Sequence, residues 1–110
     1  MKIAVPIAGG KVSAHFGHCD QFGLFDTENG EIRGREFLSP PAHEPGVFPQ
    51  WLKGQGADLV ISGGMGQRAQ QLFTSQGISV CFATPNADPE ETVKSYLQGN
   101  MATGDNRCDH

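Results

Sequence analysis

The sequence predicts a three-layer α/β domain in which a five-stranded mixed sheet lies among about three helices. Two observations lead to this prediction. In the amino-terminal part, Asn29-Gly30 stands between two short predicted strands, an arrangement typical of an antiparallel hairpin. From Gly56 onward, short apolar runs alternate with helical patterns, which indicates right-handed βαβ crossovers between parallel strands. A hairpin joined to parallel crossovers makes a mixed sheet.

The first predicted element is a buried strand from Lys2 to Ile7, where apolar residues alternate. Pro6 lacks a backbone N–H, so we expect the strand to end or to lose a ladder bond there. Residues 8–20 then form a long loop that holds two of the four histidines and one of the three cysteines. Loops of this length in small domains are commonly functional.

The hairpin is predicted over residues 21–26 and 31–37. Asn29-Gly30 between them favours a type I′ turn, because both central residues of that turn need positive φ. The second strand carries Glu and Arg side chains at four positions, so we expect it at a sheet edge with one face in water.

Residues 39–49 contain four prolines and predict an irregular excursion. A short amphipathic helix should follow, because apolar residues recur there at i, i+1, i+4 and i+5. These residues are Val47, Phe48, Trp51 and Leu52.

The second half of the chain predicts two buried parallel strands, from Leu59 to Ile61 and from Ile78 to Ala83. The helix between them runs from Gln67 to Gln76, and Gly77 suits the C′ position that ends it.

A last helix begins at Asp88-Pro89-Glu90-Glu91, which supplies a capping residue, proline at N1 and an acid at N3. Gly99 should end it. We therefore expect a single α/β domain over residues 1–99 and a polar tail over residues 100–110.

The composition limits the class of protein. One hundred and ten residues suit one domain, and eight basic against twelve acidic residues give a net charge of −4. The sequence has no cluster of Lys and Arg, so we expect neither a nucleic-acid partner nor a membrane-surface partner. We find no signal peptide, and no apolar run near the roughly 20 residues of a membrane helix. Three cysteines without a CxxC spacing indicate a reducing cytosol rather than a disulfide framework.

The glycine-rich segment Gly63-Gly64-Met65-Gly66 joins a predicted strand to a predicted helix. Free backbone N–H groups and the positive helix end would suit an anion or cluster there, and Arg68 could add charge. The alternative is a tight β–α turn that needs the glycines for its geometry. The Met65 thioether could face a ligand, although packing is favoured. The segment is not a P-loop, and its match to G-x-G-x-x-A is weak because Asp88, the required acid, suits a helix cap better.

A second candidate site is the loop segment His15-Phe16-Gly17-His18-Cys19. Imidazole and thiolate ligands suit copper, zinc or iron–sulfur species, and His15 and His18 are close enough in sequence to reach one ion. Alternatively, Phe16 fills the core and the histidines bond to local carbonyl groups. A closed zinc site is not expected without a second Cys/His pair nearby.

Three further positions carry ligand-type side chains. His43, among prolines, could close over a ligand or be a solvated loop residue. Cys81 lies in an apolar strand and is interpreted as a small buried residue. The terminal Cys108-Asp109-His110 could capture a metal ion or be inert. No hydrolytic triad is present at known spacing.

Taken in order, several segments resemble the dinitrogenase iron–molybdenum cofactor biosynthesis (NifX/NafY-like) family. The resemblance covers residues 1–99. The segments are Met1 to Pro6, Val12-Ser13, His15-Phe16-Gly17, Gly63-Gly64-Met65-Gly66, Ala69 and Gly77-Ile78.

The resemblance implies a ribonuclease-H-like fold and a protein that binds and carries or stores a metal–sulfur cluster without catalysis. The resemblance to small members of the family implies that the bound cluster is a molybdenum–copper sulfide, and an iron–molybdenum cofactor-type cluster is the alternative. Ser13, Phe16 and Gly17 would then join the glycine segment around the cluster, with His15, His18, Cys19 and His43 as candidate metal ligands. A cluster donor or acceptor protein is the expected partner, and we expect a cytoplasmic monomer or weak dimer.

Two hypotheses from other classes stay open. The first is a small nucleotide-dependent enzyme that uses the G-x-G-x-x-A loop. The second is a regulatory protein-interaction domain whose glycine segment contacts a partner.

Overall fold

The computed structural model describes residues 1–14, 19–40 and 47–99. Its elements follow the predicted order. The strands are β1 (Lys2–Ala8), β2 (Lys11–Val12), β3 (Gln21–Glu28), β4 (Glu31–Leu38), β5 (Leu59–Ser62) and β6 (Ser79–Phe82). The helices are α1 (Val47–Gly54), α2 (Gln67–Ser75) and α3 (Pro89–Leu97).

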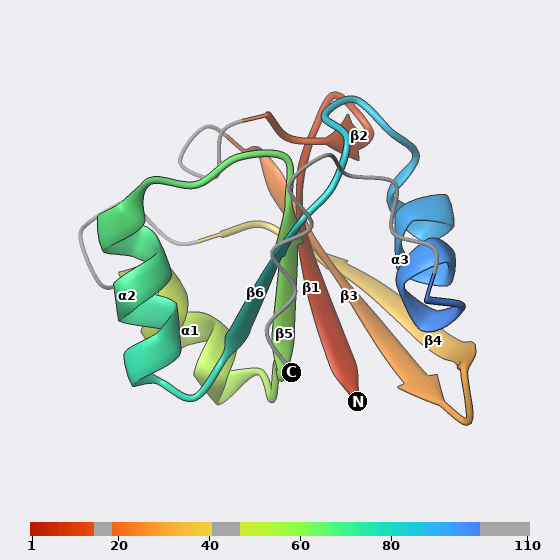
Figure 1. Cartoon of the computed structure of the whole chain (residues 1–110), viewed down its shortest axis with the longest axis horizontal. Coiled ribbons are helices and arrows are strands. Elements are labelled where there is room, and N and C mark those ends of the chain that lie inside the picture. Colours follow the sequence, from red (N-terminus) through yellow and green to blue (C-terminus); the bar gives the residue numbers. More distant parts are fainter. Residues whose placement is uncertain (15–18, 41–46, 100–110) are drawn as a thin grey trace.

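The strands form one mixed sheet in the order β4-β3-β1-β5-β6, and the short strand β2 pairs with β1. β1 is antiparallel to β3 and parallel to β5, and β5 is parallel to β6. Helices α1 and α2 cover one face of the sheet and α3 covers the other (Figure 1). The predicted three-layer α/β architecture is therefore confirmed.

The core consists of two apolar layers because successive strand residues point to opposite faces of the sheet. In β1, Ile3, Val5 and Ile7 face the layer under α3, whereas Ala4 faces the layer under α1 and α2. Phe22 and Phe73 fill this second layer and are fully buried.

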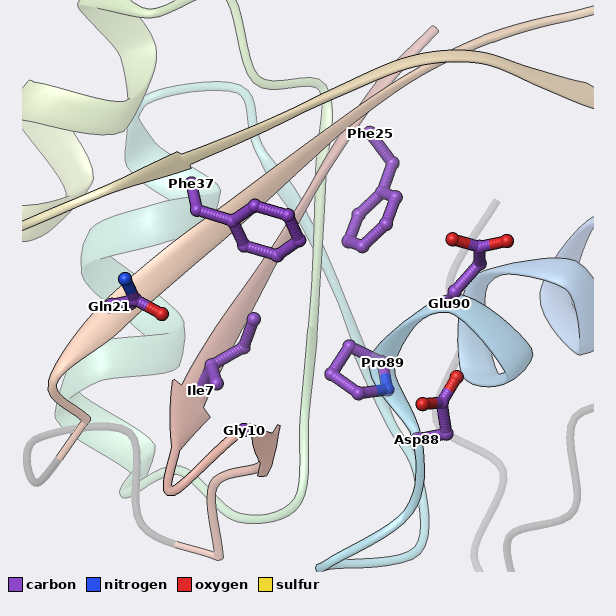
Figure 2. A pocket seen from close by; sticks show the side chains of 8 residues that line it. All are labelled: Ile7, Gly10, Gln21, Phe25, Phe37, Asp88, Pro89 and Glu90. Carbon is purple, nitrogen blue, oxygen red and sulfur yellow. The ribbon is translucent and has the colours of Figure 1, made fainter.

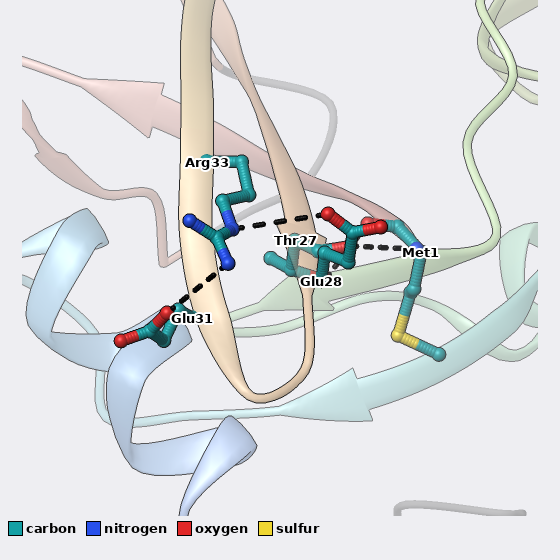
Figure 3. Close-up of polar contacts among 5 residues, drawn as sticks. All are labelled: Met1, Thr27, Glu28, Glu31 and Arg33. Atoms are coloured by element: carbon teal, nitrogen blue, oxygen red, sulfur yellow. Dashed lines mark hydrogen bonds and ion pairs between the residues drawn. The ribbon is translucent and has the colours of Figure 1, made fainter.

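The hairpin turn is as predicted: Asn29 and Gly30 have φ of 55° and 78°. At this end of the sheet, the Met1 ammonium donates to the carbonyl oxygen of Thr27 at 2.9 Å (Figure 3). Arg33 pairs with Glu28 and Glu31 across the turn. These exposed ion pairs contribute little to stability, but they place charge along the edge strand β4, which opposes edge-to-edge aggregation.

β1 runs through Pro6 as predicted and ends at Ala8, one residue later than expected. Its partners beyond Ala4 are β3 and β2, because β5 pairs with it only at Ile3 and Ala4. Cys81 is buried as expected, and it is disulfide-bonded, which the count and spacing of the cysteines did not predict.

The helix ends agree with the sequence. Gly77 and Gly99 have φ of 78° and 76° directly after α2 and α3. Within the described ranges, no helix is long and apolar enough to cross a membrane.

Candidate functional site

The glycine segment lies at the sheet edge where the parallel strands β1, β5 and β6 end (Figure 1). β1 pairs with β5 only at Ile3–Leu59 and Ala4–Val60. Beyond these pairs β2 takes the neighbouring position along β1. Ligands of open α/β sheets bind at this carboxyl edge, in the space where neighbouring strands separate.

The loop after β2 is hydrogen-bonded to the surrounding segments. The Ser13 N–H donates to the carbonyl oxygen of Pro6 at 2.9 Å, and the Gly63 N–H donates to that of Ser13 at 3.0 Å. On its other side, Val12 exchanges backbone hydrogen bonds with Asn86 and Ala87, both at 2.9 Å. Ser13 is buried, and the hydrogen bonds of its backbone position the glycine segment.

Gly63 and Gly64 are required by the close approach of this loop. A Cβ on Gly63 would lie 2.6 Å from the Ser13 carbonyl oxygen and 3.2 Å from the Cα atoms of Ala14 and Pro85. A Cβ on Gly64 would overlap the carbonyl oxygen of Ala14. Two glycines of the segment therefore serve packing, as the turn-geometry alternative proposed.

The N–H groups of these two glycines already have acceptors. Gly63 donates to Ser13, and Gly64 donates to the Ser62 Oγ at 3.3 Å, while this hydroxyl donates to the Gly64 carbonyl oxygen at 2.8 Å. The expectation of free N–H groups is wrong for Gly63 and Gly64, because the first loop and the Ser62 side chain satisfy them.

The start of α2 is different. Gly66 is the N-cap, with extended φ and ψ of −67° and 158°, and no side chain caps the helix. Within the described part of the chain, no acceptor is recorded for the N–H groups of Gln67, Arg68 and Ala69. Apart from its chain neighbours, no atom recorded in the described residues lies within 4 Å of a Cβ built on Gly66. Among the described residues, this helix end therefore has N–H donors without a recorded acceptor, together with a partial positive charge.

Side chains around this helix end have separate roles. The Arg68 side chain is exposed and has no ion pair among those recorded for the described residues. Met65 packs against the core layer under α1 and α2, as its favoured interpretation expected. Its carbonyl oxygen accepts a 3.1 Å hydrogen bond from the Gln70 amide.

Cys19 lies at the end of the first loop and is a free, half-buried thiol. It packs against the same core layer as Met65. Burial raises the pKa of this thiol from 9.0 to about 11, and the neighbouring Asp20 carboxylate adds to this effect, while a backbone hydrogen bond opposes it. The thiol is therefore protonated at neutral pH when no metal is bound.

The other predicted ligands lie outside the described residues. They are His15, Phe16, Gly17, His18, His43 and the terminal Cys108-Asp109-His110. Among the residues that the structure does describe, no three His, Cys, Asp or Glu side chains are grouped as a metal site.

Asp88 has the role of helix cap that the sequence favoured. Its carboxylate accepts a hydrogen bond from the Glu91 N–H at 2.9 Å, and Pro89 follows at N1. The acid that a dinucleotide site would require is therefore used in starting α3.

A hollow of about 390 Å³ on the α3 side of the sheet was not predicted from the sequence (Figure 2). Phe37, which lines it, is a large apolar residue that is 49% exposed on the edge strand β4, where it directly follows the charged Arg35 and Glu36. That contrast was the available signal.

Comparison with known proteins identifies relatives over almost the whole chain. The family model described as dinitrogenase iron-molybdenum cofactor matches residues 1–99. An uncharacterized protein of Methanocaldococcus jannaschii is 32% identical over 106 residues, which cover 92% of this chain and 89% of the relative.

Solved structures show the same fold. The crystal structure of the protein PH0822 has a TM-score of 0.87 at 30% identity, covering 94% of this chain and 95% of that one. The apo form of the orange protein from Desulfovibrio gigas has a TM-score of 0.76 at 22% identity, with coverages of 98% and 96%.

Proposed function

Because this chain belongs to the dinitrogenase iron–molybdenum cofactor family, we propose that it binds a metal–sulfur cluster and carries or stores it without catalytic turnover. The observation that supports this most is the uncapped start of α2 beside the exposed Arg68 side chain. Unsatisfied donors at a helix N-terminus suit an anion, and the open space at Gly66 would admit a ligand to the backbone.

The chemistry of such a cargo fits these donors. The sulfides of a metal–sulfur cluster are anionic, soft acceptors that can each take hydrogen bonds from more than one N–H group. Gln67, Arg68 and Ala69 would supply backbone donors, and the Arg68 guanidinium would add a positive charge. Gly63 and Gly64 would hold the first loop against the site rather than bond to the cluster.

The metal ions of the cluster would be contacted from the first loop. We propose His15, His18 and Cys19 as candidate ligands, with His43 approaching from the second irregular segment and Phe16 and Gly17 lining the site. Cys19 would have to lose its proton on coordination, so loading through this thiol would release a proton and weaken as pH falls.

We propose a molybdenum–copper sulfide cluster as the cargo, with an iron–molybdenum cofactor-type cluster as the alternative. The family description names an iron–molybdenum cofactor and thus supports a cluster that contains molybdenum, whereas the molybdenum–copper form comes from the sequence resemblance alone. A cluster donor or acceptor protein would be the partner of a cytoplasmic monomer or weak dimer.

Reconstitution tests this proposal. The apo-protein, incubated anaerobically with tetrathiomolybdate and copper and then desalted, should retain metal in a fixed ratio and show a visible charge-transfer band. Absence of both the band and retained metal would contradict cluster binding.

The structure favours neither of the other hypotheses. A dinucleotide site would need the Asp88 carboxylate, but this carboxylate accepts the Glu91 N–H as the cap of α3. Titration with dinucleotides at millimolar concentration should therefore give no binding. No observation on the described residues singles out a protein-interaction role for the glycine segment.

A further inference from the structure

The hollow on the α3 side of the sheet is separate from the start of α2, which packs on the other face (Figures 1 and 2). Its walls are apolar and come from three segments of the chain. Ile7 belongs to β1, Phe25 and Phe37 come from the hairpin, and Pro89 begins α3. The volume of about 390 Å³ falls in the range of sites for small organic molecules.

The aromatic wall depends on a glycine in the neighbouring strand. Gly23 of β3 pairs with Phe37 of β4. A Cβ on Gly23 would lie 3.0 Å from side-chain atoms of Ile7 and Phe25 and 3.3 Å from the Phe37 ring. The two rings meet edge to face, with centroids 6.1 Å apart. The Phe37 ring therefore lies over the backbone and keeps one side exposed.

The polar residues lining the hollow provide acceptors and negative charge. Among the described residues, its charged lining side chains are Asp88 and Glu90, and Gln21 contributes an amide. In Figure 2, Gln21 lies across the hollow from the two carboxylates, with the apolar walls between them. No basic residue lines the hollow in the described part of the chain.

Both carboxylates can still accept from a ligand. Asp88 uses its Oδ2 atom for the cap of α3. Glu90 pairs with Arg35 at 2.9 Å and Lys94 at 3.4 Å, but both basic side chains are nearly half exposed. Exposed ion pairs are weak, so a ligand cation can share the Glu90 carboxylate.

An anion is disfavoured at this site. The Asp88 carboxylate already occupies the positive end of α3, where an anion would otherwise bind. The hollow and the start of α2 therefore have opposite charge preferences, and a sulfide cluster suits only the latter.

We propose that the hollow binds a small aromatic amine. Its flat ring would lie between Phe37 and Pro89, and its ammonium would face Glu90 and Asp88. This site would be independent of the cluster site.

A matched pair of indoles tests the charge preference. Tryptamine and indole-3-propionate share a ring and a two-carbon arm but differ in the sign of the terminal charge. We expect tryptamine to shift the amide resonances of Gly10, Gln21 and Glu90 saturably in ¹⁵N-labelled full chain, with Kd of about 1 mM or tighter. Indole-3-propionate should bind at least about fivefold more weakly. Equal binding of both compounds, or no saturable shift with tryptamine, would overturn the proposal.

Substitutions at Glu90 and Phe37 test the location of the site, and a substitution at Glu91 is the control. Glu90→Gln should weaken tryptamine binding severalfold, whereas Glu91→Gln, in the same helical turn but outside the hollow, should leave it unchanged. Phe37→Ala should abolish saturable binding, and its circular dichroism should match that of the unsubstituted chain. Binding that is insensitive to both Glu90→Gln and Phe37→Ala would contradict the proposed site.

Discussion

Gly63 donates its backbone N–H to the carbonyl oxygen of Ser13 at 3.0 Å, and a Cβ on Gly63 would lie 2.6 Å from that same oxygen. One close approach thus explains both why the first loop lies against the end of β5 and why position 63 is glycine. It also limits the proposed ligand donors to the start of α2.

Alanine substitutions at Gly63 and Gly66 should distinguish a glycine required by close packing from an exposed one. Gly63→Ala forces the first loop away and should lower the free energy of unfolding by about 1–3 kcal/mol. Gly66→Ala meets no atom within 4 Å and loses only N-cap preference, so it should cost less than about 1 kcal/mol. Urea denaturation measures both. Equal destabilisation by the two variants would contradict this assignment of roles.

Asp88 should stabilise the protein as the cap of α3. Asp88→Ala removes the acceptor of the Glu91 N–H and should lower the free energy of unfolding by about 1 kcal/mol. Asp88→Asn, which can still accept that hydrogen bond, should recover most of the loss. Thermal or urea denaturation provides the measurement, and an Asn variant as unstable as the Ala variant would argue against capping.

Cys19 should react slowly in the folded, metal-free chain. Because burial raises the pKa of its thiol to about 11, little thiolate is present at pH 8, and alkylation by iodoacetamide should accelerate on unfolding. Cys19→Ser should remove this labelling. Equally fast labelling of folded and unfolded chains would show that the thiol is not desolvated.

The raised pKa of the Cys19 thiol predicts how the free energy of unfolding changes with pH. The unfolded state ionises near pH 9 and the folded state near pH 11, so above pH 9 the unfolded chain binds fewer protons. The free energy of unfolding should therefore fall between pH 9 and 11 through this group. Cys19→Ser should show a smaller decrease over the same interval, and an identical decrease would exclude the effect.

Most of the fold could be predicted from local sequence. Asn29-Gly30, Asp88-Pro89 and Gly77 each carry backbone preferences strong enough to place a turn or a helix end. β2 and the extension of β1 to Ala8 could not be predicted, because they depend on partners from distant segments.

The site could be predicted less completely. Sequence identified the glycine segment, but only the packing of Ser13 and Ala14 distinguishes Gly63 and Gly64 from Gly66. The hollow beside Phe37 was missed because its walls come from β1, the hairpin and α3, which no local pattern connects.

Under the proposed function, the uncapped start of α2 binds an anionic metal–sulfur cluster. Gly66→Asp and Gly66→Asn both suit the extended backbone at the N-cap and should change stability by only a few tenths of a kcal/mol. Only Asp places a negative charge beside the proposed ligand.

Anaerobic reconstitution with tetrathiomolybdate and copper, followed by metal analysis of the desalted protein, compares these variants directly. The Asn variant should retain the cluster better than the Asp variant, whose affinity should fall about tenfold or more, as expected for one opposing charge. Equal retention by the Asp variant, the Asn variant and the unsubstituted chain would contradict a cluster site at this helix end.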